Sequence, residues 1–153
     1  MKGLSSISTE LPVQGVRLLM DASANIPDAI HLEVGEPNVN TPLYIRKAAE
    51  EAMQNEYTHY APNAGLTSLR ESIVDHMKIK YNLDTTVNNV TVTAGAVNAL
   101  MVSLLAIVDR GEEVLIPDPA WPNYEMMLKV QGAIPKRYEL LPERNFTPGV
   151  TKF

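Results

Sequence analysis

The 153-residue sequence contains no cysteine. This absence excludes disulfide bonds, thiolate metal sites and a cysteine nucleophile, and it makes the cytoplasm the expected compartment. Basic residues are in the minority, with 13 lysines and arginines against 18 acidic residues and a formal net charge of -5. Proteins that bind nucleic acid or anionic membranes need a basic face. The charge therefore favours small-molecule partners over nucleic acid.

Long apolar runs are absent too. The longest, residues 99–108, is interrupted by Ser103 and is too short to span a bilayer. The start M-K-G-L-S-S-I-S lacks the apolar core of a signal peptide, so we expect neither export nor membrane insertion. The three histidines, His31, His59 and His76, are too far apart in sequence to form a ligand pair on one helix, so no metal site is expected.

The phosphate-binding motifs of nucleotide enzymes are missing as well. The sequence has no G-x-G-x-x-G dinucleotide motif, no G-x-x-x-x-G-K-[ST] triphosphate loop and no G-x-S-x-G hydrolase motif. Nicotinamide, ATP and serine-hydrolase chemistry are therefore disfavoured. The composition, with 45% hydrophobic and 20% charged residues, is typical of an ordinary globular protein.

Turn residues and apolar spacing predict the order of the elements. The first forty residues, punctuated by prolines, are expected to form an irregular arm. Two helices should follow, one with Thr41 as cap, Pro42 at its first position and its end near Asn55, the other from about Thr67 to Tyr81. Strands are then expected at 90–93, 113–116 and 134–141, with helices at 96–108 and 123–131 between them. This alternation predicts an α/β fold with a largely parallel sheet, in which binding sites gather at the carboxyl ends of the strands.

The stretch from residue 90 to residue 124 carries the strongest functional signal. A strand stops at Gly95 and a helix starts at once, so the backbone N–H groups of Gly95, Ala96 and Val97 can hold a phosphate at the positive end of the helix dipole. The next strand ends at Pro117, after which Trp121 offers a flat aromatic face. A phosphate site at the helix start and an aromatic face at Trp121 together suggest a phosphorylated aromatic cofactor. A tight turn without ligand and a core tryptophan are the alternatives.

Four segments carry a family resemblance, namely I-H-L-E-V-G-E-P-N-V-N-T-P, Y-T-H-Y-A-P-N-A-G-L-T-S-L-R, V-T-V-T-A-G-A-V-N-A-L and D-R-G-E-E-V-L-I-P-D-P-A-W-P-N-Y. In order and spacing, over roughly residues 17–148, the sequence resembles the amino-terminal half of a class I/II pyridoxal-phosphate-dependent aminotransferase of fold type I. The resemblance implies a partial three-layer sandwich with a mostly parallel sheet, preceded by an irregular amino-terminal arm. It divides the chain into residues 1–40, the arm with a small-domain segment, and residues 41–153, an incomplete cofactor-binding large domain.

The same resemblance implies roles for single residues. The cofactor, pyridoxal 5′-phosphate, would be held by the backbone donors at 95–97, with Trp121 stacked on its pyridine ring. Gly35 would lie near the substrate carboxylate. Tyr60 is similar to the tyrosine that donates its hydroxyl to the cofactor phosphate of the partner subunit in a homodimer. Arg70 matches a position where a structural ion pair is expected. Many relatives have threonine, serine or lysine at the position of Val97, and that polar side chain assists phosphate or substrate binding. Because valine lacks it, the identity of the substrate does not follow from the resemblance.

The lysine that forms a Schiff base with the cofactor in this family has no counterpart in the sequence. The family's S-x-x-K motif lies far downstream, and the aspartate that pairs with the pyridine nitrogen and the arginine that clamps the substrate carboxylate also lack counterparts. We therefore expect a truncated aminotransferase chain without a catalytic residue of its own, inactive alone. Its uncovered apolar edges should make it poorly soluble or self-associating.

Three functions stay open at this point. By resemblance, the leading one is a transaminase that moves an amino group between an amino acid and a 2-oxo acid. The second is a fold type I lyase, which uses the same cofactor for β-elimination. The third is a non-catalytic fragment that binds a partner.

Overall fold

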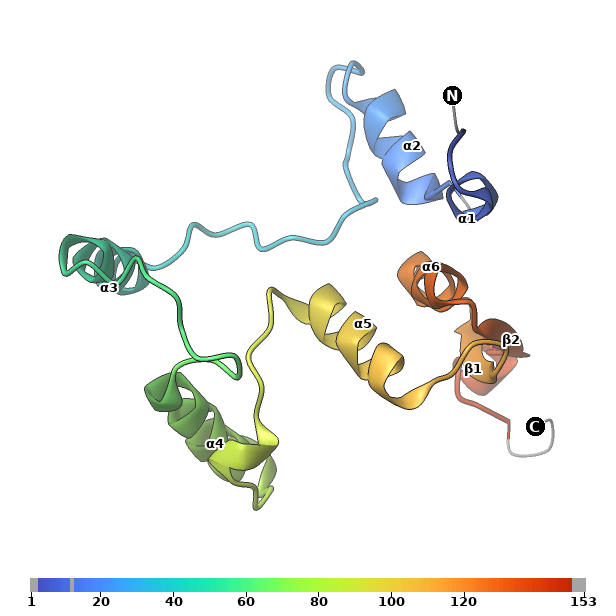
Figure 1. Ribbon diagram of the computed structural model, residues 1–153. Helices are drawn as coiled ribbons and strands as arrows, with labels where there is room; N and C mark the ends of the chain where they lie inside the picture. The colour runs from blue at the N-terminus through green and yellow to red at the C-terminus, as the bar shows by residue number, and fades with distance from the viewer. Residues whose placement is uncertain (1–2, 12, 150–153) are drawn as a thin grey trace. The chain divides into compact units, whose positions relative to one another are not determined.

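The computed structural model describes residues 3–11 and 13–149. Their contacts divide them into two compact units, which we call the sheet unit, up to residue 26 and from residue 94, and the helical unit, residues 27–93. The elements in chain order are α1 (Ser6–Glu10), α2 (Gly15–Ser23), α3 (Leu43–Gln54), α4 (Thr67–Tyr81), η1 (Val87–Asn89), α5 (Ala96–Ile107), β1 (Glu113–Asp118), α6 (Pro122–Gln131), β2 (Ile134–Glu139) and η2 (Pro142–Arg144) (Figure 1).

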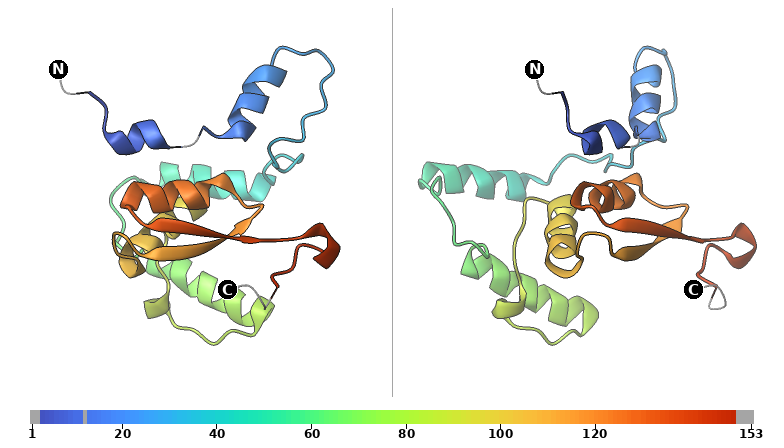
Figure 2. Two further views of the ribbon diagram at one scale, coloured as in Figure 1. Left: turned by 90° about the vertical axis from the view of Figure 1, so that its right-hand side faces the viewer. Right: turned by 45° about the vertical axis from the view of Figure 1, so that its right-hand side comes forward.

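The sheet unit is built on the parallel pair of β1 and β2, in which Glu113 lies opposite Ile134 and Asp118 opposite Glu139. Parallel strands require a crossover connection, and α6 provides it (Figure 2). Pro122 opens α6, where its missing N–H costs no hydrogen bond. Gly132 ends the helix with a φ of 87°, a conformation that glycine adopts without strain. The observed βαβ unit agrees with the predicted α/β fold.

The core of the sheet unit lies between α6 and the strands. A contacting cluster of buried residues is formed by Ile116 on β1, Leu128 on α6 and Ala133 just before β2; Met127 on α6 is also buried, and Leu128 is only 1% exposed. Four partly buried side chains surround them: Leu104, Val108, Val114 and Tyr124. Burying one leucine contributes roughly 1.5–3 kcal/mol, so this small cluster is the main force that fixes α6 against the strands.

The amino-terminal segment, expected to be irregular, contains two short helices. Ser5 caps α1, because the backbone N–H of Ser8 donates to its hydroxyl oxygen at 3.3 Å. Gln14, just before α2, donates through its side-chain amide to Asn123 Oδ1 and to Met126 Sδ, the latter at 3.3 Å. Both acceptors lie on α6, so the segment belongs to the sheet unit.

The helical unit contains α3 and α4. The bounds of α4 are those that the sequence predicts, and Asn82 ends it in the left-handed region with a φ of 51°. The predicted cap of α3 is wrong by one residue, since Pro42 and not Thr41 occupies the N-cap position. The ψ of Pro42 is 142°, which is still extended backbone, so the helix starts at Leu43.

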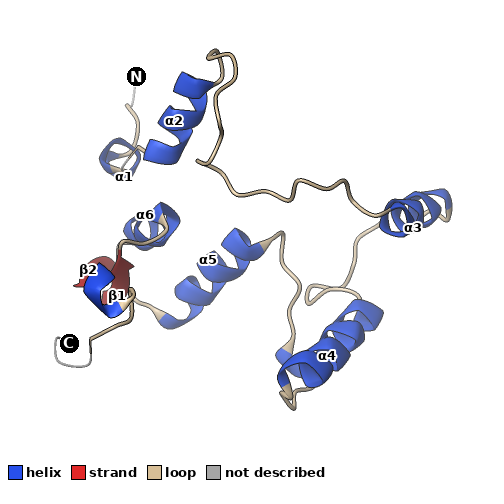
Figure 3. Cartoon of the chain, turned by 180° about the vertical axis from the view of Figure 1, so that it is seen from behind, coloured by secondary structure: helices blue, strands red, loops and turns tan. Residues whose placement is uncertain are grey.

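The strand expected at 90–93 is absent from the sheet. Figure 3 shows loop between η1 and α5, with no strand. The backbone is extended at Val90, with φ -117° and ψ 126°, but a strand needs a neighbour, and the described residues supply none for it. Instead, the N–H of Val92 donates to the carbonyl of Ala64 at 3.0 Å, and a Cβ on Gly65 would lie 2.7 Å from the Cβ of Val92.

The remaining strands differ slightly from their predicted bounds. β1 continues through Pro117 to Asp118, and β2 ends at Glu139, after which the N–H of Leu140 donates to the carbonyl of Asp118 at 2.8 Å. Among the helices of the described residues, none is long and apolar enough to cross a membrane.

Uncovered apolar surface on β1 predicts self-association of the chain. Leu115 is 55% exposed, and it lines an open apolar groove with Leu100, Leu104 and Tyr124. We expect the chain to sediment as a concentration-dependent mixture above monomer mass, and Leu115→Lys to shift it toward monomer because a charge opposes burial of that surface. Gln54→Lys, which adds the same charge on α3, should leave the distribution unchanged. A compact monomer at all concentrations contradicts the prediction.

Candidate functional site

The head of α5 is shaped by Gly95. This residue is the N-cap and has a φ of 87° and a ψ of 169°, a region that side-chain-bearing residues avoid. A Cβ at this position would meet nothing within 4 Å, so backbone conformation and not crowding selects glycine here. Glycine also has no side chain with which to cap the first helical turn. The first N–H groups of an α-helix have no intrahelical acceptor.

The approach to this helix is held by Asn98. The N–H of Ala94 donates to Asn98 Oδ1 at 3.3 Å, and the first backbone bond of the helix runs from Ala99 to the carbonyl of Gly95 at 3.1 Å. These bonds fix the backbone on both sides of Gly95. Val97 follows within the first turn, and its apolar side chain leaves only its N–H as a donor to a phosphate.

Trp121 lies at the start of the second crossover helix. It occupies the N-cap position of α6, and it is 42% exposed. Its ring meets Tyr124 edge to face, with centroids 5.5 Å apart and an interplanar angle of 87°. Tyr124 in turn packs against the core. The indole is therefore supported through Tyr124 and retains open surface, as a stacking platform requires.

The first turns of α5 and α6 lie next to each other. Val97 and Met101 of α5 line an open pocket of about 270 Å³ together with Asn123 and three further α6 residues, Met126, Met127 and Val130. Val97 and Asn123 belong to the first turns of their helices, so the starts of α5 and α6 both border this pocket. α6 follows the end of β1 after a short loop and leads back to the start of the parallel strand β2. The positive end of α6 therefore lies at the carboxyl end of β1.

An ion-pair network that the sequence analysis missed lies at the same edge. Arg137 on β2 places Nη1 3.2 Å from Asp118 Oδ2 and donates through Nη2 to Glu125 Oε2, while Lys129 Nζ lies 2.7 Å from Glu125 Oε1. The spacing of Glu125 and Lys129, four residues apart on a helix, is the one signal that could have been found in the sequence. The contacts of Arg137 depend on the register of β1 and β2, which the sequence does not specify.

This network changes the ionisation of its members. Hydrogen bonds from Lys129 and then from Arg137 hold the pKa of the Glu125 carboxyl below its ordinary value of 4.5, against a smaller opposing effect of burial. The hydrogen bond to Glu125, followed by that to Asp118, raises the pKa of the Arg137 guanidinium. Glu125 and Arg137 are therefore both charged at neutral pH.

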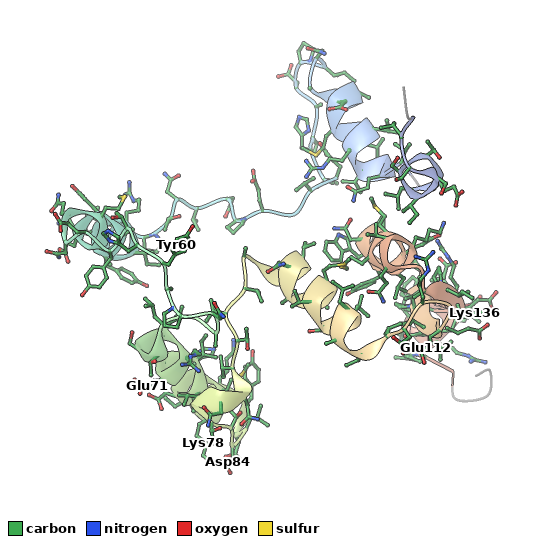
Figure 4. All side chains as sticks on the ribbon, in the orientation of Figure 1. Tyr60, Glu71, Lys78, Asp84, Glu112 and Lys136 are labelled. Carbon is green, nitrogen blue, oxygen red and sulfur yellow. The ribbon has the colours of Figure 1, made fainter. Side chains whose placement is uncertain are left out.

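Tyr60 and Gly35 belong to the helical unit. Tyr60 lies on the loop after α3, and its relative exposure is 107%, so its hydroxyl is accessible to another molecule (Figure 4). Gly35 is also exposed, a Cβ there would meet nothing within 4 Å, and its φ lies outside the left-handed region.

Arg70, expected in an ion pair, instead donates to the carbonyl of Val87 at 3.0 Å and to Thr67 Oγ1 at 3.3 Å. It links α4 to η1.

Comparison with known proteins decides the family. The sequence profile described as "Aminotransferase class I and II" matches residues 27–153. The chain belongs to this family. It is 41% identical over 133 residues to an aspartate aminotransferase of Pyrococcus horikoshii, covering 87% of this chain and 34% of that protein. It is also 34% identical over 151 residues to a putative aminotransferase of Bacillus subtilis, covering 98% of this chain and 39% of that one.

A solved structure supports the same assignment. The aspartate aminotransferase from Thermus thermophilus with maleate superposes with a TM-score of 0.90 at 31% identity, over 97% of this chain and 40% of that chain. The chain thus has the fold type I architecture, of which it forms a part, and it spans about a third of the length of the curated relatives it matches. Class I and II aminotransferases are pyridoxal-phosphate-dependent enzymes.

The residues present fit this cofactor. A phosphate needs several N–H donors and room for close approach. The first turn of α5 carries such donors, and a Cβ at Gly95 would meet nothing within 4 Å. A pyridine ring needs an accessible aromatic face, and Trp121 has one. In the described part of the chain, no group of three or more acidic or histidine side chains is arranged to hold a metal ion.

The charge network predicts a pH-dependent contribution of Glu125 to stability. Because the folded-state pKa of Glu125 lies below its ordinary value of 4.5, its contribution is present above that pH and is lost as the pH falls through the folded-state pKa. Glu125→Gln should lower the free energy of unfolding by about 1 kcal/mol at neutral pH, since both cationic partners are partly exposed.

Urea unfolding, measured at neutral pH and well below pH 4.5, checks this expectation. The difference between the wild type and the variant should disappear in acid. Glu113→Gln is the control, because Glu113 pairs with Lys136 at 2.9 Å on the exposed start of β1. A pH-independent difference for Glu125→Gln contradicts the assignment.

Proposed function

We propose that this chain is the cofactor-binding, amino-terminal part of an aminotransferase that moves an amino group between an amino acid and a 2-oxo acid. The observation that carries the proposal is the glycine-headed start of α5, which shares a pocket with the first turn of α6, the helix whose N-cap is the partly exposed Trp121. The family membership supports it. The proposed compartment is the cytoplasm, and the proposed assembly of the full-length protein is a homodimer.

Each residue has a definite task in this proposal. The N–H groups of Gly95, Ala96 and Val97 bind the cofactor phosphate, and the positive end of α5 favours its negative charge. Trp121 lies against the pyridine ring and restrains its plane. When bound, pyridoxal 5′-phosphate supplies an electron sink for chemistry at the substrate α-carbon.

Two residues of the helical unit complete the proposal. Tyr60 donates its hydroxyl to the cofactor phosphate of the partner subunit, for which its full exposure is a requirement. Gly35 offers its backbone near the substrate carboxylate, and its open surroundings allow close approach. The expected division into residues 1–40 and residues 41–153 belongs to the same proposal.

Catalysis requires a lysine that this chain lacks at a matching position, so we propose that the chain alone binds the cofactor without turning over substrate. A full-length protein that converts 2-oxoglutarate to glutamate supports the transaminase. Release of pyruvate and ammonia instead would identify the β-eliminating lyase. A stable complex with another protein in the absence of cofactor would favour the partner-binding fragment.

Cofactor binding by the chain itself tests the central part of the proposal. The probe is pyridoxamine 5′-phosphate, which has no aldehyde and so does not react with lysine side chains. Trp121→Ala should weaken its binding about tenfold in equilibrium dialysis, because an aromatic stack contributes roughly 0.5–1.5 kcal/mol beyond the surface it buries. Tyr44→Ala removes an exposed aromatic ring from α3 and should leave binding unchanged.

Pyridoxamine without the phosphate provides the second comparison. It should bind much more weakly than pyridoxamine 5′-phosphate if the head of α5 holds the phosphate. Equal affinities of the two compounds, or equal losses in the two aromatic variants, count against the proposed function.

A further inference from the structure

The segment that carries Trp121 is anchored at both of its ends by one side chain. Residues 119–121 connect the end of β1 to the start of α6. Arg137 contacts Asp118, which precedes this segment, and Glu125, in the first turn of the helix that follows it. The carbonyl of Asp118 also accepts the N–H of Leu140 at 2.8 Å. One guanidinium on β2 therefore spans the connection in which the indole lies.

The register of the sheet places Arg137 where it can make both contacts. Arg137 lies opposite Ile116, two residues before the end of β1, and its long side chain extends along the strand toward Asp118. A planar guanidinium presents several donors in a fixed geometry, so it can serve two carboxylates at once. A lysine ammonium is a point charge on a flexible stem and is less suited to holding two groups in a fixed relation.

Tyr124 restrains the indole locally. Its ring meets Tyr124 edge to face, and the N–H of Tyr124 donates to the carbonyl of Trp121 at 3.1 Å. With much of its surface exposed, the indole is not locked by burial. Its orientation therefore depends on where the backbone of residues 119–121 lies. Without Arg137, no guanidinium would link the carboxylates of Asp118 and Glu125 across that segment, and of the two only Glu125 would keep a cationic partner among the described residues, Lys129.

The stability of α6 has separate sources. Leu128 is buried in the core, and Lys129 pairs with Glu125 at 2.7 Å through the carboxylate oxygen that Arg137 does not contact. Loss of Arg137 should consequently loosen the connection without unfolding the helix. A loosened connection in a folded helix would therefore distinguish a positioning role of Arg137 from a general role in stability.

We propose that Arg137 is a positioning residue for the indole of Trp121, and that through the indole it orients the ring of the bound cofactor. The second half of this inference rests on the proposed function, whereas the first half concerns the chain alone. The guanidinium itself touches neither phosphate nor ring in this role.

The fluorescence of Trp121 provides a direct readout, because it is the only tryptophan in the sequence. In Arg137→Met, the anisotropy of the indole without cofactor should fall and its quenching by acrylamide should rise, while the thermal unfolding midpoint stays close to that of the wild type. Arg137→Lys should give intermediate values. Lys136→Met is the matched control, because its partner Glu113 lies at the opposite end of β1 from Trp121.

Asp118→Ala provides a second variant in case Arg137→Met does not fold. It removes one of the two carboxylates and should loosen the indole in the same direction. Unchanged anisotropy in the folded Arg137 or Asp118 variants overturns the inference. An equal fall in Lys136→Met also overturns it, since the effect would then not be specific to the connection.

Binding of pyridoxamine 5′-phosphate tests the link to the cofactor. Arg137→Met should weaken binding about three- to tenfold, corresponding to a modest loss of preorganisation, while the binding of inorganic phosphate should not change. If the wild-type chain does not bind pyridoxamine 5′-phosphate, the proposed function fails, and the anisotropy measurement still decides the role of Arg137. Unchanged affinity in Arg137→Met with normal wild-type binding overturns the cofactor half of the inference.

Discussion

The packing of α6 against the parallel strands is the interaction on which the sheet unit depends. Leu128 is buried between Ile116 and Ala133, and this contact holds the crossover helix along β1 and β2. Because the helix must run against the strands to connect them, its start lies at the carboxyl end of β1. Trp121 is brought there as a consequence. The first turns of α5 and α6 border a common pocket.

Burial and charge have different roles at this edge. Burial of a leucine contributes roughly 1.5–3 kcal/mol, whereas a partly exposed ion pair contributes about 1 kcal/mol or less. The apolar cluster therefore determines that α6 docks, and the weaker contacts of Arg137 refine the position of the connection before it. A ligand-binding site benefits when burial docks the helix and exposed ion pairs adjust the position of the connection. The surface that the ligand needs is then left uncovered.

Sequence patterns predicted those features that depend on local spacing. The bounds of α4 follow from its apolar periodicity, and the break at Gly95 follows from a conformation that glycine tolerates best. The sequence predictions lack the Ser5 cap of α1 and the contacts of Arg137 for different reasons. Ser5 is a local signal of a helix start, whereas the Arg137 contacts join residues on different elements and require the strand register.

The segment at 90–93 shows the limit of local prediction most clearly. Its composition is that of a strand, and its backbone is extended at Val90, but pairing depends on a neighbouring strand. The described residues provide a turn at Ala64 and Gly65 as its contact instead.

The amide signals at the head of α5 test the account most directly. Pyridoxamine 5′-phosphate can be titrated into the isotope-labelled chain while the backbone N–H resonances of Gly95, Ala96 and Val97 are followed by nuclear magnetic resonance. The account predicts that these three resonances shift downfield and saturate together with the indole N–H of Trp121. Saturable binding that leaves them unmoved and shifts resonances elsewhere would contradict the central claim.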